Sequence, residues 1–478
     1  MSSTISKSIV WSLSDKFGFQ VIGLLVQLIL ARMLNPDDFG ALGIVMIFIT
    51  LSNLILDGGF GAAIINKTDV TDTDLCSVFY LNMIISVILY VVLWFTSSLI
   101  ETFFDIQALA ILIKVGGLAF LINAAGIVQN ALTMRDMQFH ILARVRLISL
   151  SLASFVAIST AYVGFGVWSL IFFQLSMAVF KVIGLWIYSK WRLSRNFSKE
   201  AIKKMFPYGS SLMVSGVVSE LFENIYSIVI GRSFSSYNLG LYYQSKNIQT
   251  LPVLTFSSAI ENVIFSSFSR FKNSVEVMKC SFRKALKLEC IIIFPLMLGL
   301  VFLAEPLVTV LFTDKWIEMV PILRIMAFSG MMYPIAVVNM NILKVTGRSD
   351  LYFRLTLVTR TIIVCLLVFS FKYGLLALIA VRSISSLVNG LIYQHYAGRM
   401  ISYNLIHQYK DLWRILLAGL IMSASLFLFT EFYKNQMLVQ LILGGMIGGL
   451  IYLFSLVLLK ESFLHEILNY GKSITFKK

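Results

Sequence analysis

Apolar stretches of membrane-crossing length recur along the chain, and they constrain its fold more than any other feature. Of the 478 residues, 58% are hydrophobic and 13% are charged, whereas soluble globular domains carry about 25% charged residues. Because a helix needs about 20 apolar residues to cross a bilayer, the sequence predicts an all-α polytopic membrane protein. The fourteen predicted spans cover residues 9–31, 39–64, 76–100, 108–132, 141–163, 166–189, 208–231, 238–266, 288–312, 319–343, 351–371, 373–396, 412–431 and 437–460.

The basic residues predict the orientation of these spans. The chain has a net charge of +15, and most of its 39 lysines and arginines fall in loops and span ends on one side of the predicted membrane. Under the positive-inside rule this side is cytoplasmic, so we expect an even number of spans and both termini in the cytoplasm. The basic excess then reflects topology and contact with anionic membrane lipid, and it does not indicate nucleic-acid binding.

The chain also carries an internal repeat. Arg32 and Gly40, eight residues apart, recur 200 residues later as Arg232 and Gly240. In both copies the pair follows one predicted span and opens the next. We interpret these four residues as candidate gating or structural positions.

The repeat predicts how the spans are grouped. An amino-terminal lobe over 1–190 and a carboxy-terminal lobe over 208–398 would each hold six spans in the same orientation. Such parallel repeats are related by a pseudo-two-fold axis along the membrane normal, as in some secondary transporters. A basic amphipathic linker over 191–207, helical in part, would join the lobes on the cytoplasmic side. The two spans within 399–478 lie outside the repeat and either brace the second lobe or face a partner.

Ionisable residues inside the predicted spans are the candidate functional groups. A charge at the bilayer centre costs about 2.5–3.5 kcal/mol on insertion scales, so it normally faces a bundle interior or a watery cavity. We predict that the cations bind substrate and that the acids couple transport to H+ or Na+. Two carboxylates at i, i+3 spacing share a helical face, and such proximity is expected to raise the pKa of one of them. The predicted cations are Lys16, Lys246, Arg360 and Arg382, and the predicted acids are Asp15, Glu220 and Glu223.

Structural readings of these residues remain open. Lys16 could extend its ammonium to the headgroups, and the glutamate pair could form structural ion pairs. Arg360 and Arg382 fit equally well as cavity cations or as partners of carboxylates. Asp57 precedes two glycines at the end of the second span and either closes that helix or borders the cavity. Glu261 lies opposite a polar run in the eighth span and is a further candidate gating or structural residue.

The sequence contains no constellation that indicates catalysis. Its four cysteines and four histidines are scattered without metal-ligand spacing, and no glycine-rich phosphate-binding loop is present. We therefore expect neither catalytic residues nor a metal site, and no cofactor apart from a coupling ion. The predicted class is a transporter rather than an enzyme.

Three short motifs resemble one transporter family. ILARML at 29–34, DFG at 38–40 and DGGFG at 57–61 resemble the bacterial polysaccharide transporters of the MOP superfamily, which also contains MATE exporters and lipid II flippases. The similarity extends over essentially the whole chain and is strongest to Wzx-type transporters of lipopolysaccharide, O-antigen or capsule biosynthesis.

The resemblance implies a flippase in the bacterial cytoplasmic (inner) membrane. Such a protein moves an undecaprenyl-pyrophosphate-linked oligosaccharide to the outer leaflet by alternating access, with polysaccharide polymerase machinery as a further partner. Cavity cations would hold the pyrophosphate. Lys16 and Lys246 occupy the first and eighth spans, where lipid II flippases use such cations. The first two spans carry fewer basic residues than those flippases do, which argues against lipid II as the substrate.

Other functions fit parts of the pattern. A MATE-like antiporter of small cations needs little more than Asp15, Glu220 and Glu223. A membrane glycan polymerase or ligase usually needs a large extracytoplasmic loop, whereas the longest candidates here, near 101–105 and 314–318, are short. A non-catalytic assembly partner would explain the two extra spans.

Overall fold

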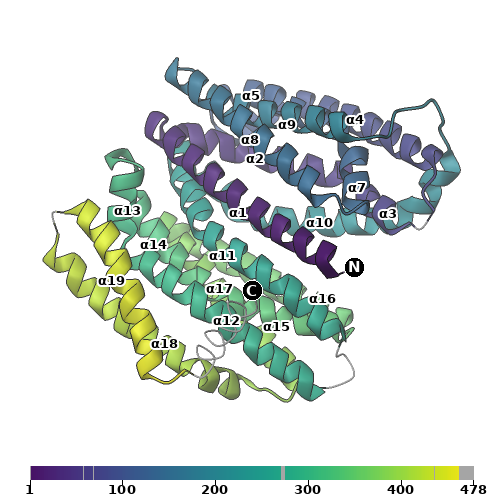
Figure 1. Ribbon diagram of the computed structural model, residues 1–478. Coiled ribbons are helices and arrows are strands. Elements are labelled where there is room, and N and C mark those ends of the chain that lie inside the picture. Colours follow the sequence, from purple (N-terminus) through teal and green to yellow (C-terminus); the bar gives the residue numbers. More distant parts are fainter. Residues whose placement is uncertain (1, 58, 68, 271–274, 435, 462–478) are drawn as a thin grey trace. The chain divides into compact units, whose positions relative to one another are not determined.

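The computed structural model describes residues 2–461 except 58, 68, 271–274 and 435 (Figure 1). Every regular element in this part of the chain is helical, which confirms the predicted all-α class. Some side chains inside helices lie outside the description, namely those of 2–17, 62, 66, 201, 204–209, 211–212, 258–270, 275 and 349.

Contacts between residues of the chain divide the protein into two compact units, Met1–Tyr243 and Gln244–Lys478. We describe each unit by itself. Residues 191–207 are the predicted linker between lobes, whereas the boundary between the contact units falls inside a helix, at 243/244. The grouping of spans into two six-helix lobes stays a prediction.

The described residues of the first unit form ten helices and the start of an eleventh. They are α1 (Ser2–Met33), α2 (Pro36–Asp57), α3 (Phe60–Asn66), α4 (Asp72–Phe104), α5 (Leu109–Gly116), α6 (Leu118–Ala124), α7 (Ile127–Arg135), α8 (Phe139–Tyr162), α9 (Val167–Tyr188), α10 (Lys199–Ser233) and the beginning of α11 (Ser236–Arg270).

The second unit contains the rest of α11 and the remaining helices. They are α12 (Val275–Phe302), α13 (Ala304–Leu311), η1 (Asp314–Trp316), α14 (Met319–Gly330), α15 (Tyr333–Val345), α16 (Ser349–Ser370), η2 (Phe371–Tyr373), α17 (Leu375–Met400), α18 (Leu405–Phe432) and α19 (Met437–Leu458).

Each predicted span coincides with one helix or with a series of shorter helices. Among the described residues, eleven segments are long and apolar enough to cross a membrane, and α5–α7 make a twelfth if their bent helices count as one span. The described apolar part of α1, Gly18–Met33, is shorter. The polytopic membrane class is therefore confirmed. The predicted number of fourteen spans is consistent with these counts and stays a prediction.

Two predicted spans are broken near one end of the first unit. The span 39–64 stops at Asp57, because Gly59 takes a left-handed φ of 69° before α3 begins. The span 108–132 bends by 44° between α6 and α7. At this bend the indole Nε1–H of Trp186 donates to the carbonyl oxygen of Ala125 at 2.8 Å, and this bond satisfies a backbone group that has left the helical ladder.

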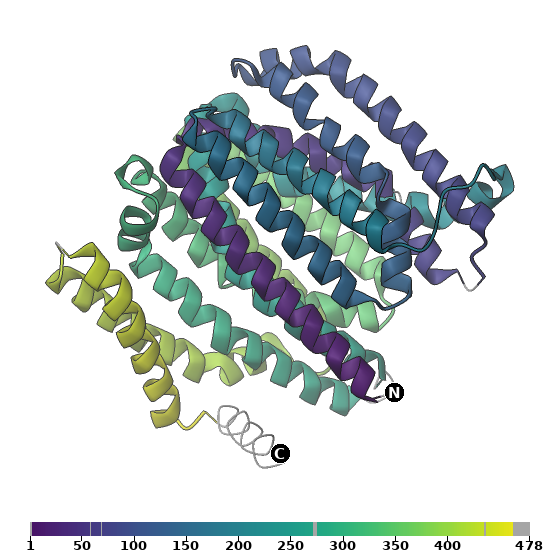
Figure 2. The ribbon, with the colours of Figure 1, turned by 45° about the horizontal axis from the view of Figure 1, so that its top comes forward.

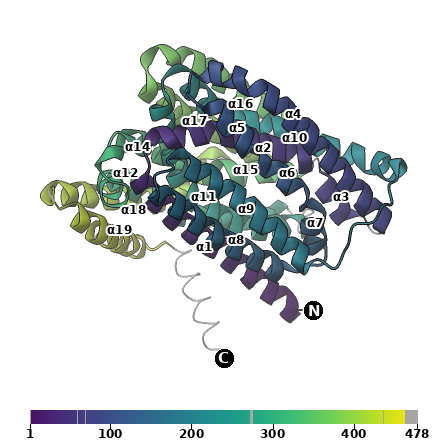
Figure 3. The same ribbon diagram turned by 90° about the horizontal axis from the view of Figure 1, so that it is seen from above.

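Small residues allow the helices of the first unit to approach closely. α8 packs against both α1 and α9 (Figure 3), and its Ala153 and Ala157 are fully buried. Ser149 and Ser154 donate their hydroxyl groups to carbonyls one turn back, at 2.6 and 2.5 Å. Such small and self-satisfied polar residues are typical of helix contacts inside membranes.

The predicted linker differs in part from its expected form. Lys199 is the first residue of α10, so the expected amphipathic helix is the start of that long helix rather than a separate element. The extended segment before it is bound to the start of α4. Trp191 donates its Nε1–H to Asp72 Oδ1 at 2.7 Å, and the backbone N–H of Ser198 donates to Ser77 Oγ at 2.8 Å.

The two extra helices pack inside the second unit. α18 and α19, yellow-green and yellow in Figure 2, lie side by side, and α18 contacts α12. Three fully buried amides tie α18 to α15 and α17: Gln408 exchanges hydrogen bonds of 3.1 and 3.2 Å with Asn339, and Gln394 donates to Gln408 at 3.3 Å. The helix pair is therefore joined to the unit by polar contacts as well as by apolar packing.

Candidate functional site

Each copy of the repeat begins its helix with a hydrogen bond between a backbone N–H and a side chain, but the direction of the bond differs. In the first copy, the backbone N–H of Asn35 donates to Asp38 Oδ2 at 2.9 Å before α2 begins at Pro36. In the second, the N–H of Asn238 donates to Ser235 Oγ at 3.1 Å. Both arrangements satisfy backbone groups at a helix start through a side chain three residues away. The aligned segments therefore both cap the start of a helix, through the position-38 side chain in the first copy and the position-235 side chain in the second.

The starts of α2 and α11 meet at a contact that we call the glycine crossing, formed by Pro36, Gly40, Ser236 and Gly240. A Cβ atom added to Gly40 would lie 1.9 Å from the carbonyl oxygen of Ser236, and one added to Gly240 would lie 1.8 Å from that of Pro36. Each glycine therefore faces the backbone of the other copy at equivalent positions, because Pro36 and Ser236 are aligned in the repeat. Only glycine permits such an approach of two backbones.

Other predicted residues of the repeat surround the crossing. The Ser236 hydroxyl is hydrogen-bonded to the Asp37 carboxylate. Arg32 and Arg232 are exposed at the ends of α1 and α10. The guanidinium of Arg232 lies 5.3 Å from the ring centre of Phe103, within the range of a cation–π contact.

The structure describes two of the predicted acids, which differ in exposure. Glu220 is half-buried on α10, and its carboxylate accepts a hydrogen bond from Asn224 Nδ2 at 2.7 Å. Glu223 on the same helix is exposed. The side chains of Asp15 and Glu261 lie outside the described residues, so their predicted roles stay predictions.

The predicted cations of the second unit come from three different helices. Lys246 on α11, Arg360 on α16 and Arg382 on α17 are all half-buried, and each is engaged by other groups of the protein. The Lys16 side chain lies outside the described residues. The structure therefore gives positions for three of the four predicted cations, and substrate binding by them stays a prediction.

A polar cavity in the first unit was not predicted from the sequence. Its volume is about 440 Å³, and it lies between the end of α2, α3, the α6–α7 bend and α9. Asp57, the last residue of α2, borders it, and its carboxylate accepts the backbone N–H of Gly61 in the first turn of α3. The other polar side chains in its lining are Asn53, Asn123, Asn130 and Lys181.

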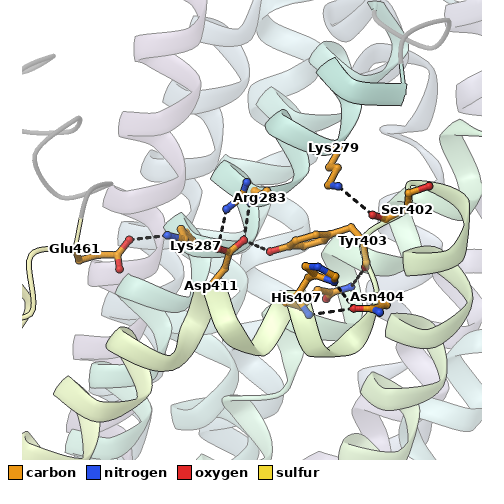
Figure 4. A network of polar contacts seen from close by, with 10 residues as sticks. Lys279, Arg283, Lys287, Ser402, Tyr403, Asn404, His407, Asp411 and Glu461 are labelled. Atoms are coloured by element: carbon orange, nitrogen blue, oxygen red, sulfur yellow. Dashed lines mark hydrogen bonds and ion pairs between the residues drawn. The ribbon is translucent and has the colours of Figure 1, made fainter.

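A second polar cluster, drawn in Figure 4, joins α12 to α18 and to the residues after α19. Arg283 makes a two-pronged contact with Asp411, through Nε at 2.6 Å and Nη2 at 2.7 Å. Lys287 pairs with Glu461 at 2.7 Å, and these two side chains are 13% and 0% exposed. Burial, together with the neighbouring Asp411 carboxylate, raises the pKa of Tyr403 far above its usual value. Its phenol therefore stays protonated and donates to that carboxylate.

The sequence contains only weak signals for the cavity and for the polar cluster. Lys181 is a fifth basic residue inside a predicted span, but nothing in the sequence relates it to Asp57. Glu461 follows the last span and has no charged neighbour at helical spacing that would identify its partner. Among the described residues, no three histidine, cysteine, aspartate or glutamate side chains come together to hold a metal ion.

Comparisons with known proteins agree with this architecture. The chain is 28% identical over 412 residues to the teichuronic acid biosynthesis protein TuaB of Bacillus subtilis (strain 168), with 85% of each chain covered. It is 24% identical over 479 residues to the succinoglycan biosynthesis transport protein ExoT of Rhizobium meliloti (strain 1021), covering 99% of this chain and 96% of that one.

Among solved structures, the lipid II flippase MurJ in its inward closed conformation has the same fold. The TM-score is 0.76 at 16% identity, with 95% of this chain and all of that chain covered. This likeness confirms the MOP-type fold that the sequence motifs predict. The model of a family described as polysaccharide biosynthesis protein matches residues 29–321, more than half of the sequence, and the chain therefore belongs to that family.

Proposed function

We propose that this chain is a flippase that moves a lipid-linked oligosaccharide across a membrane by alternating access. Membership in a polysaccharide biosynthesis family, a full-length relative named as a transport protein and a fold shared with a lipid II flippase support this proposal. The further proposals are an undecaprenyl-pyrophosphate carrier, an inner-membrane location with both termini in the cytoplasm, and polymerase machinery as a partner.

The glycine crossing is the observation that carries the mechanism. In alternating access, two repeats rock around a fixed site, so a contact between equivalent positions of the repeats can break when they part. The crossing follows α1 and α10, which places it on the extracytoplasmic side if both termini are cytoplasmic. We propose that it closes that side while substrate loads from the cytoplasmic leaflet, and that it separates on release.

The charged residues are assigned roles within the same proposal. Arg360 and Arg382 suit pyrophosphate because a guanidinium donates two parallel hydrogen bonds to phosphate oxygens, and Lys16 and Lys246 add point charges. Asp15 and the Glu220–Glu223 pair would couple release to H+ or Na+.

Leaflet-selective labelling in a deletion strain tests the function. If the proposal holds, complete lipid-linked oligosaccharide accumulates with its glycan facing the cytoplasm, and mass spectrometry identifies the sugar. Re-expression of the full chain must restore the wild-type distribution. Accumulation of single units facing outward would indicate a polymerase or ligase instead, and an unchanged lipid-linked pool would refute translocation of this substrate class.

A further inference from the structure

The polar cavity of the first unit has the size and lining of a binding site. Its volume of about 440 Å³ falls within the range of about 300–1,000 Å³ that is usual for small-molecule sites. One carboxylate, one ammonium and three carboxamides share its lining. They come from α2, α6, α7 and α9, and the single contact between two of the amides is a long one of 3.5 Å from Asn123 to Asn53.

The Asp57 carboxylate and the Lys181 ammonium attract each other but do not form an ion pair. Lys181 is attracted by Asp57 and repelled by Arg146, and the described residues contain no ion pair between Asp57 and Lys181 within 4.0 Å. Lys181 is half-buried and Asp57 is exposed, so these charges do not require direct pairing with each other. Because no ion pair joins them, the Lys181 ammonium and the Asp57 carboxylate can each bond to a ligand in the cavity that both residues line.

This balance of charge selects the chemical class of the ligand. A cation that approached Asp57 would be repelled by Lys181 and by Arg146, and an anion that approached Lys181 would be repelled by Asp57. A hydroxyl group donates one hydrogen bond and accepts others, so it can donate to the carboxylate and accept from the ammonium. The carboxamides of Asn53 and Asn130 supply further donors and acceptors.

We propose that this cavity binds a neutral, hydroxyl-rich sugar of the glycan headgroup, an inference that rests on the proposed function. The cavity lies where α3 and α7 end. At this end of the unit Arg135 donates to the carbonyl oxygen of Ile64 at 3.3 Å, and Lys67 follows α3. These basic residues belong to the side that we propose is cytoplasmic. A glycan on the cytoplasmic leaflet would therefore meet the cavity before translocation.

Variants of the two charged residues test the proposal in the deletion strain. Lys181→Met keeps the length of the side chain and removes its donor. Asp57→Asn keeps an acceptor for the Gly61 N–H and removes the charge. Loss of one hydrogen bond to a charged group corresponds to a decrease of about tenfold or more, so both variants should raise the inward-facing glycan toward the deletion level. Lys114→Met is the matched control, because this lysine of α5 lies over the Trp94 ring, 4.7 Å from its centre.

A binding measurement separates a sugar site from an ion site. The probe is the free glycan released by mild acid from the lipid-linked oligosaccharide that accumulates in the deletion strain. Saturation-transfer NMR on the purified full chain should show contacts to its ring protons, which Lys181→Met removes and Lys114→Met retains. Size-exclusion profiles and melting temperatures must match for the variants compared.

The outcomes distinguish the cavity from the function as a whole. If deletion causes no inward-facing glycan to accumulate, the proposed function fails. If deletion does cause inward-facing glycan to accumulate but both cavity variants translocate normally, only the sugar site is overturned. Equal NMR contacts in wild type and Lys181→Met would likewise overturn it. Displacement of the glycan by excess NaCl would overturn it in favour of an ion site.

Discussion

Replacing Gly240 by alanine should force the glycine crossing apart. The new Cβ would lie 1.8 Å from the Pro36 carbonyl oxygen, whereas real Cβ atoms essentially never come within 3.0 Å of such a neighbour. The two backbones must therefore separate by at least 1.2 Å, the difference between these distances. Because the neighbour is backbone, no rotamer change relieves the clash.

The energetic cost follows from that displacement. Overpacking of a tight contact costs about 1–3 kcal/mol, and separation also weakens the hydrogen bond between Asp37 and Ser236. A bias of about 1–3 kcal/mol against the closed crossing corresponds to a change of about 5–150-fold in the ratio of the two access states. We therefore expect Gly240→Ala to depopulate the state that is closed at this end and to slow translocation.

Cysteine cross-linking measures this change directly. In a chain whose four native cysteines are replaced, Asp37→Cys and Ser236→Cys should form a disulfide on mild oxidation, and Gly240→Ala should lower the yield at least about fivefold. Gly23→Ala on α1 is the matched control, since no atom lies within 4 Å of its added Cβ. An unchanged cross-linking yield together with normal translocation would refute the assignment of the crossing as a closing contact.

Two further predictions concern charged residues of the second unit. Glu461→Gln should lower the free energy of unfolding by about 3–5 kcal/mol, because it leaves the Lys287 ammonium, which is only 13% exposed, without its charged partner. In the same thermal unfolding measurement Glu431→Gln should cost about 0–1 kcal/mol, since its ion pair with a lysine is mostly exposed. Lys246→Ala and Arg382→Ala should reduce surface glycan while membrane insertion stays normal, as judged by glycan blotting and membrane fractionation. Normal glycan in both variants would exclude these cations from the mechanism.

The membrane-spanning elements could be predicted because their signal is local. About twenty apolar residues in succession specify a span, and the recurrence of arginine and glycine identified the positions that meet at the crossing. The second predicted span was continued to residue 64, although Asp57 and the two glycines after it were a candidate helix end. The bend between α6 and α7 was not predicted, because hydropathy changes little there. Gly59, with its left-handed φ, was the available signal at the first break.

The cavity and the cluster of Figure 4 could not be predicted for a different reason. Asp57 and Lys181 lie on helices that are distant in sequence, and only tertiary packing brings them to one cavity. Asn53 and Asn123 add hydrogen-bonding capacity without any charge that would single them out. Lys287 and Glu461 likewise pair across a long sequence separation, so each looks like an ordinary residue near a membrane surface when read alone.

The reciprocal contact at the crossing also limits how the two halves of the gene can diverge. A clash between side chains can be relieved by a smaller residue on either partner. The carbonyl oxygens of Pro36 and Ser236, however, are present whichever residues occupy those positions. No second-site change at 36 or 236 can therefore compensate for a larger residue at 240 or 40. Each copy of the duplicated segment thus restricts its counterpart to glycine at this point, however far the surrounding side chains drift apart.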